Sequence, residues 1–144
     1  MVEPALFGPI DSVLAPVIEF VLLVLVAANM GTRLLAHRAH LRQAENGAES
    51  LSRHRLHEAS NLVLVLASFY FLTLHVHAGM VISVIVLGTV IADFFEFEGR
   101  QVELRQGWEL EPPKGAIVGS MLALAYAAFQ SLFFLVKPFW ELIV

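Results

Sequence analysis

Long apolar segments, interrupted by few polar positions, dominate this chain. Between Ala59 and Ala92 there are 34 consecutive residues without Asp, Glu, Lys or Arg, more than the roughly 20 residues that one membrane-spanning helix requires. A short polar segment, residues 75–79, divides this stretch, so the pattern predicts a helical hairpin with its turn there. Two further apolar segments complete a set of four predicted spans, at about residues 12–36, 55–76, 79–98 and 114–137.

Helices are favoured over strands in these segments, because the apolar runs are continuous rather than alternating and a helix satisfies its own backbone hydrogen bonds in lipid. The composition agrees, since 58% of the residues are hydrophobic, 15% are charged and the mean hydropathy is +0.73. These values exclude a disordered chain, a basic nucleic-acid-binding domain and most ordinary soluble enzymes. We therefore predict an all-α membrane protein in which residues 1–144 form one antiparallel bundle of four transmembrane helices.

The distribution of basic residues predicts the orientation of this bundle. Eight of the nine Lys and Arg residues lie between the first and second spans, between the third and fourth spans, or in the span ends that adjoin these loops, at Arg33, Arg38, Arg42, Arg53, Arg55, Arg100, Arg105 and Lys114. Positively charged loops remain in the cytoplasm, so both termini are expected outside the cell. The first two helices are expected to extend into the cytoplasm as a hairpin that turns at Asn46-Gly47, with Ser50 or Ser52 capping the second helix.

Polar residues inside predicted spans are the natural candidates for function in a membrane protein. The topology places them in two layers, an outer layer of Glu19 and Gln130 and an inner layer of Asn29, Asn61, Asp93 and Ser120. Hydrogen bonds between helices account for such residues without a further role, and we favour this interpretation. The alternative is a proton or ion path between the two layers.

Small residues recur at four-residue spacing in the last span, at Gly115, Gly119, Ala123 and Ala127. Such a stripe allows a second helix to approach closely. The approaching helix belongs either to this bundle or to a partner chain, and Gly88 is a candidate contact in both cases.

Six histidines occur as three pairs. If the predicted hairpin turns at Gly47, His37 lies opposite His57 and His40 lies opposite His54. Four imidazoles in such a group could bind zinc, copper or a haem, although the neighbouring arginines repel a cation. We favour instead a polar surface that contacts anionic lipid headgroups. His75 and His77 are expected in the outer turn, at the membrane interface.

Acidic residues follow the third span, and Glu96 and Arg100 are predicted to form an exposed i,i+4 ion pair. The chain contains no cysteine and no recognisable catalytic motif, so no enzymatic activity and no cofactor are expected. The favoured function is that of a structural or accessory subunit of a homo-oligomer or of a larger membrane complex, with lipid and membrane proteins as partners. The alternatives are a bis-histidine haem or metal protein at the cytoplasmic face and a small ion or proton channel or transporter.

Three motifs carry a resemblance to a known family: residues 7–13 (FGPIDSV), residues 57–61 (HEASN) and residues 93–98 (DFFEFE). On these motifs the chain resembles a family of short four-span membrane proteins of unknown function found in halophilic archaea. The resemblance implies a cell-membrane location over nearly the whole chain and implies no activity.

Overall fold

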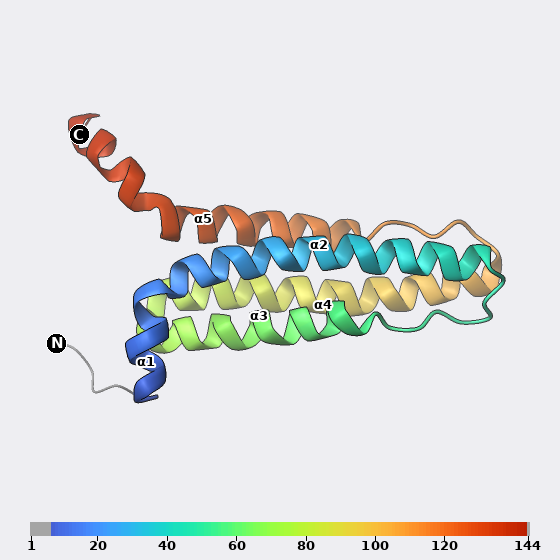
Figure 1. Ribbon diagram of the computed structural model, residues 1–144. Coiled ribbons are helices and arrows are strands. Elements are labelled where there is room, and N and C mark those ends of the chain that lie inside the picture. The colour runs from blue at the N-terminus through green and yellow to red at the C-terminus, as the bar shows by residue number, and fades with distance from the viewer. Residues whose placement is uncertain (1–6, 144) are drawn as a thin grey trace.

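The structure is a computed structural model that describes residues 7–143, apart from the side chains of residues 134–136. Within this part every regular element is helical. The elements, in chain order, are α1 (Pro9–Leu14), the 3-10 helix η1 (Ala15–Val17), α2 (Ile18–Glu45), α3 (Arg55–Leu74), α4 (Val76–Gln106) and α5 (Lys114–Ile143). The four long helices lie side by side, with α2 against α3, α3 against α4, α4 against α5 and α5 against α2 (Figure 1).

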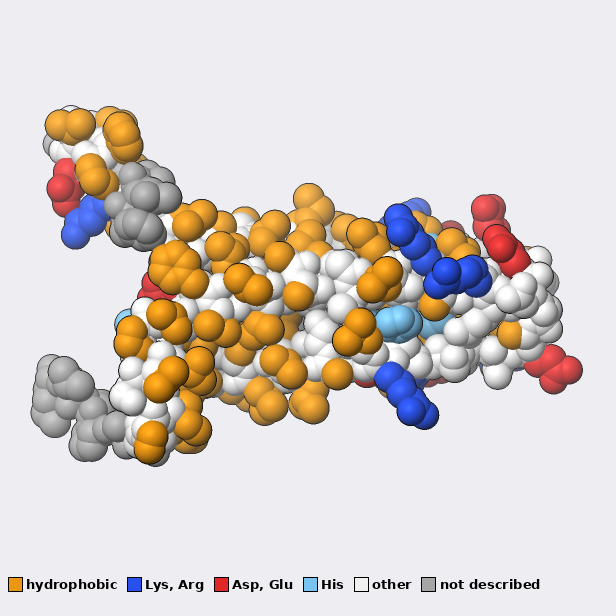
Figure 2. Space-filling view, viewed as in Figure 1, with side chains coloured by type: hydrophobic (Ala, Val, Ile, Leu, Met, Phe, Trp, Pro, Cys, Tyr) orange, Lys and Arg blue, Asp and Glu red, His pale blue; other side chains and the backbone are white. Residues whose placement is uncertain are grey.

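Four helical segments are long and apolar enough to cross a membrane, which confirms the number that the apolar pattern predicts. Large apolar side chains are exposed on every long helix, for example Val24, Leu66, Val84 and Val118. Figure 2 shows hydrophobic side chains along most of the four-helix body, while charged side chains on this face gather mainly toward one end. We call the end that carries residues 46–54 and 107–113 the charged end.

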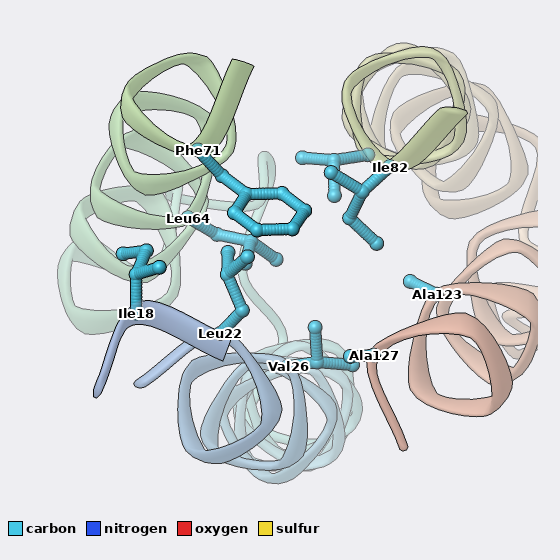
Figure 3. Packing of buried hydrophobic residues seen from close by; sticks show 9 residues of the cluster. Ile18, Leu22, Val26, Leu64, Phe71, Ile82, Ala123 and Ala127 are labelled. Atoms are coloured by element: carbon cyan, nitrogen blue, oxygen red, sulfur yellow. The ribbon is translucent and has the colours of Figure 1, made fainter. Parts of the chain in front are cut away.

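An apolar core fills the part of the body away from the charged end. It is built from residues at helical spacing on α2 and from apolar residues of the other three long helices, namely Ile18, Leu22, Val26, Leu64, Phe71, Ile82, Val86, Ala123 and Ala127 (Figure 3). The small residues of α5 bring that helix close to the larger side chains of its neighbours, and burial of this apolar surface stabilises the packing.

The junction between α3 and α4 is shorter than predicted. The sequence pattern places a turn over residues 75–79, but α3 ends at Leu74 and α4 begins at Val76, so His75 alone separates them. The helices approach so closely that a Cβ added to Gly79 would collide with the backbone of Leu72. The tight turn therefore depends on a residue without a side chain at position 79.

The first span also differs from the continuous helix expected from about residue 12. The chain forms α1, then the single turn η1, and α2 begins only at Ile18. Pro16 lies in η1 and lacks the amide hydrogen that a continuous α-helix would use, and Figure 1 shows α1 turned away from the axis of α2. Tyr70 of α3 donates a hydrogen bond to Asp11 and so attaches α1 to the body.

At the charged end the predicted stop of the first helix at Asn46-Gly47 is confirmed, because α2 ends at Glu45, but the second helix does not extend beside it as predicted. The helices that extend furthest are α2, to Glu45, and α4, to Gln106, whereas α3 begins only at Arg55. The cap of α3 is His54, which accepts a hydrogen bond from the amide of His57, and not Ser50 or Ser52. Residues 46–54 instead fold back along the two extended helices.

A second, smaller apolar cluster explains why residues 46–54 take this course. Leu51 is buried against Phe97 of α4 and Leu110 of the segment that precedes α5. The side chain of Gln101 donates to the carbonyl of Leu51 at 2.7 Å and accepts from its amide at 2.9 Å. These contacts give hydrogen-bond partners to the backbone of Leu51, which lies in an irregular segment and has no helical partner.

Candidate functional site

Five buried polar side chains from three helices form one hydrogen-bonded group, which we call the polar network: Asn29, Arg33, His57, Asn61 and Asp93. None of them is more than 8% exposed. The two residues from α2 are one helical turn apart, as are the two from α3, so each pair shares one face of its helix. Along the helices, the network lies between the apolar core and the smaller cluster around Leu51.

Asp93 of α4 is the centre of the polar network. The guanidinium of Arg33 donates to both carboxylate oxygens, from Nε to Oδ1 at 3.0 Å and from Nη2 to Oδ2 at 2.8 Å. Oδ2 also accepts from Nε2 of His57 at 2.9 Å and from Nδ2 of Asn61 at 3.2 Å. A carboxylate has about four acceptor positions, and four donors of this chain contact Asp93, one at Oδ1 and three at Oδ2.

Two asparagines close the polar network into a ring. Nη2 of Arg33 also donates to Oδ1 of Asn29 at 2.7 Å, and Nδ2 of Asn29 donates to Oδ1 of Asn61 at 2.8 Å. Nδ2 of Asn61 donates to Asp93 and so completes the ring. The hydroxyl oxygen of Ser60 accepts a further hydrogen bond from Asn29 at 3.0 Å. An amide side chain carries both donors and acceptors, so each asparagine connects two neighbours.

His57 connects the ring to Thr32. Because an ionised Asp93 can only accept, Nε2 of His57 carries a proton, and a neutral ring then presents Nδ1 as an acceptor. The hydroxyl of Thr32 lies 2.8 Å from Nδ1 and 3.0 Å from the carbonyl of Asn29. The single hydroxyl proton serves one of these two acceptors, so Thr32 connects His57 with the backbone of α2.

The chemistry of this arrangement favours a fixed structure. A buried ion pair is stable when its geometry is good and its remaining donors and acceptors are satisfied. Here Arg33 and Asp93 meet through two parallel hydrogen bonds, and His57 and Asn61 supply the other donors to the carboxylate. Nη1 of Arg33 is the one nitrogen of the ion pair that is buried without a hydrogen bond to the described residues. The polar network therefore joins α2, α3 and α4 in one relative position and leaves no unused carboxylate oxygen for a substrate.

The residues of the predicted polar layers have different environments. Asn29, Asn61 and Asp93 lie in the polar network, whereas Ser120 donates to the carbonyl of Ile117 on its own helix. Glu19 is partly exposed, with a carboxylate oxygen 4.0 Å from Nε2 of His75. Gln130 is half-buried on α5, and residues 7–143 contain no hydrogen bond between it and Glu19.

The four histidines of the predicted metal or haem site have different hydrogen-bond partners, although His37 and His54 are near enough to His40 for their charges to act on it. His57 contacts Thr32, which lies five residues before its predicted partner His37 on α2. His40 contacts the carbonyl of Ser52 at 2.9 Å, and His54 caps α3. No group of three or more His, Cys, Asp or Glu side chains in the described residues is arranged to hold a metal ion. The predicted pairing of His37 with His57 assumes a tight turn at Gly47. The irregular segment between Glu45 and Arg55 instead shifts α3 along α2 by more than one helical turn, so that His57 lies against Thr32.

The small residues of α5 face helices of the same chain. A Cβ added to Gly119 would collide with the side chain of Thr89, and one added to Gly115 would lie 3.2 Å from a carboxylate oxygen of Glu96. Ala123 and Ala127 belong to the apolar core. Gly88, by contrast, is exposed on α4 with nothing within 4 Å of an added Cβ.

Glu96 has a different partner from the one predicted. Its carboxylate accepts from the amides of Gly115 at 2.7 Å and Ala116 at 2.9 Å. These amides belong to the first turn of α5, where backbone donors lack partners within the helix and where negative charge is favourable. The predicted i,i+4 pair with Arg100 is absent from the ion pairs of the described residues.

Arg33 is the member of the polar network that the charge pattern places among the basic cytoplasmic residues instead of in the interior. Its position contained a usable signal, since Arg33 lies four residues after Asn29 and therefore on the same helix face. An arginine at this spacing, together with an unpaired acid in another span, indicates a buried ion pair.

Comparisons with curated proteins and with solved structures gave no match. One family matches, over residues 3–144, under the description "Domain of unknown function (DUF7313)". The match includes all five residues of the polar network and covers nearly the whole chain. The chain therefore belongs to the DUF7313 family.

Proposed function

We propose that this protein is a multi-pass membrane protein, an antiparallel four-helix bundle with both termini outside the cell, that acts as a structural or accessory subunit. Its partners are copies of itself or the subunits of a larger membrane complex. The observation that carries the proposal is the closed interior, in which the charges of Arg33 and Asp93 oppose each other within the polar network and an apolar core fills the adjoining space.

The interior argues against a transport path through one copy of the chain. A path for ions or protons requires polar groups or water across the whole bundle. Nine buried apolar residues instead form the core next to the polar network. The buried hydroxyls of Ser68 and Ser131 bond carbonyls of their own helices, as is typical of hydroxyl side chains in helices.

The surface supports membrane placement and the proposed orientation. Apolar side chains are exposed on all four long helices, as expected for a surface in contact with lipid. The arginines Arg38, Arg42, Arg53, Arg55 and Arg105 are exposed toward the charged end, which is therefore proposed to face the cytoplasm. A halophilic archaeal membrane is proposed from the motif resemblance and from the excess of acidic over basic residues, 13 against 9.

The absence of cysteine from the sequence makes cross-linking a clean test of the subunit role. Single cysteines at exposed positions of three helices, Leu66→Cys, Val84→Cys and Val118→Cys, would be oxidised in native membranes and the products sized. The mass of the unmodified protein would be measured after extraction in a mild detergent. We expect one oligomer or one stoichiometric complex, with cross-links confined to one helix face.

A monomer without a stoichiometric partner and without cross-links at these positions would overturn the subunit proposal. Proteoliposomes provide the second arm, in which proton and ion flux is compared with protein-free vesicles. We expect no difference. Flux that Asp93→Asn or Glu19→Gln abolishes would establish transport instead.

A further inference from the structure

Arg100, on α4 at the charged end, is a buried cation that forms no ion pair with the described residues, although Asp93, Glu96 and Glu103 are near enough for their charges to act on it. It is 6% exposed, and its Nε and Nη1 atoms form no hydrogen bond with the described residues. The acidic residues one turn away are engaged elsewhere, since Glu96 accepts from the first turn of α5 and Glu103 accepts from the amide of Glu111. A buried guanidinium without acceptors is strongly unfavourable, so this position calls for an acceptor from outside the chain.

Arg100 lines a cavity of about 460 Å³ between α4 and the segment that leads to α5. Phe95, Val102 and Trp108 also line this cavity, and all three are exposed. The cavity thus combines a cationic group with apolar and aromatic side chains. Trp and other aromatic residues are typical of the level at which lipid headgroups meet hydrocarbon.

A second nitrogen without a partner lies near the same arginine. Nδ1 of His37 is buried and makes no hydrogen bond within the described part of the chain, and His37 is close enough to Arg100 to experience its charge. The guanidinium of Arg100 only donates hydrogen bonds, whereas Nδ1 of His37 donates or accepts according to its tautomer. Arg100 therefore calls for an acceptor rather than for a cation or a metal.

We infer that this cavity binds the phosphate group of a membrane phospholipid, with Arg100 donating to the phosphate and the lipid chains lying along Phe95 and Val102. The arginine fork suits phosphate oxygens, and charge-assisted bonds of this kind are strong. Glu96, Glu103 and Glu111 also line the cavity and disfavour a free, multiply charged phosphate. They favour a headgroup that carries an ammonium as well, such as phosphatidylethanolamine. The inference rests on the membrane placement proposed above.

The first test fills the cavity without altering Arg100. Gly99 lines the cavity, and a Cβ added there meets nothing within 4 Å, so Gly99→Leu occupies the space that the lipid would use. Gly88→Leu is the matched control, because Gly88 is equally open on the same helix but lies outside the lining. Binding of phosphatidylethanolamine to the delipidated full-length protein would be measured by native mass spectrometry.

We expect one tightly bound lipid in the unmodified protein and in Gly88→Leu, with affinity at least about tenfold lower in Gly99→Leu. The second test replaces the cation, with Arg100→Gln compared with the exposed control Arg105→Gln. The same loss is expected for Arg100→Gln only. Equal lipid binding in Gly99→Leu and Gly88→Leu would overturn the inference even if Arg100→Gln fails to fold.

Two further measurements are needed. One distinguishes a lipid phosphate from free phosphate, and the other distinguishes failure of this inference from failure of the proposed membrane placement. Inorganic phosphate at millimolar concentration should not displace the bound lipid, and displacement by it would overturn the lipid assignment. Resistance of the protein to alkaline extraction from membranes tests the membrane placement independently. A protein that stays in the membrane but binds no lipid at this cavity refutes the inference and leaves the proposed function intact.

Discussion

At the scale of single residues, Asp93 has the largest influence on the interior of this protein. Its carboxylate is shared by a guanidinium, an imidazole and an amide from two other helices. A buried charge of this kind is stable only while its partner is present, because the desolvation of both groups has already taken place. The cost of removing one partner is therefore larger than the net contribution of the pair.

Replacing Asp93 with asparagine should destabilise the fold strongly. Asp93→Asn keeps the shape of the side chain but leaves the charge of Arg33 buried without a counter-charge, which typically costs about 3–5 kcal/mol. Denaturant titration of the detergent-solubilised protein, followed by circular dichroism, measures the loss. Glu98→Gln is the control, because its exposed carboxylate pairs with Arg53 at the surface and contributes at most about 1 kcal/mol. Equal stability of the two variants would contradict the role of the polar network.

Glu96 acts at the same scale on a different helix. Glu96→Gln removes the negative charge from the first turn of α5 while keeping a side-chain oxygen that can accept a hydrogen bond. We expect a loss of about 0.5–2 kcal/mol, the range for helix capping interactions. The same titration measures it, with the exposed Glu109→Gln as a control that should leave stability unchanged. A larger effect of Glu109→Gln would show that Glu96 does not cap α5.

At the scale of elements, the junctions depart most from the sequence predictions. The α3–α4 turn is reduced to His75 because Gly79 allows the two helices to touch. At the charged end, α2 and α4 extend together because Leu51 and Leu110, both outside the helices, cover the apolar surface between them. Apolar periodicity identifies the long helices but contains no information about such contacts between distant segments.

The α3–α4 junction gives a direct test of this packing. Gly79→Ala places a methyl group against the backbone of Leu72, so the helices must separate and the protein should unfold at a lower temperature. Gly31→Ala is the control, since position 31 lies within α2 with free space around an added Cβ and alanine favours helix. Thermal unfolding in detergent should show a decrease for Gly79→Ala and no decrease for Gly31→Ala. The opposite order would refute the close approach.

At the scale of the whole molecule, charge is separated along the long axis of the four-helix body. Apolar side chains cover most of its length, and the exposed arginines gather toward the charged end (Figure 2). This separation predicts the orientation in a membrane, because positively charged segments are retained on the cytoplasmic side.

Labelling of single cysteines in intact cells measures that orientation. Ser50→Cys and His77→Cys place exposed thiols at opposite ends of the body, in a chain that has no cysteine of its own. A membrane-impermeant maleimide should label His77→Cys in intact cells and Ser50→Cys only after permeabilisation. Labelling in the reverse order would show that the charged end faces outward.

The sequence by itself determined the helical class and the number of helices that can cross a membrane, because long apolar runs without charge have few other stable forms. It also singled out Asn29, Asn61 and Asp93. Only the tertiary structure decided that Arg33 and His57 join them, that Glu96 caps α5 and that His57 contacts Thr32 rather than His37. The positions of the histidines depend on how far residues 46–54 shift α3 along α2. That shift is decided by contacts between residues far apart in the sequence, such as Leu51 with Phe97 and Gln101.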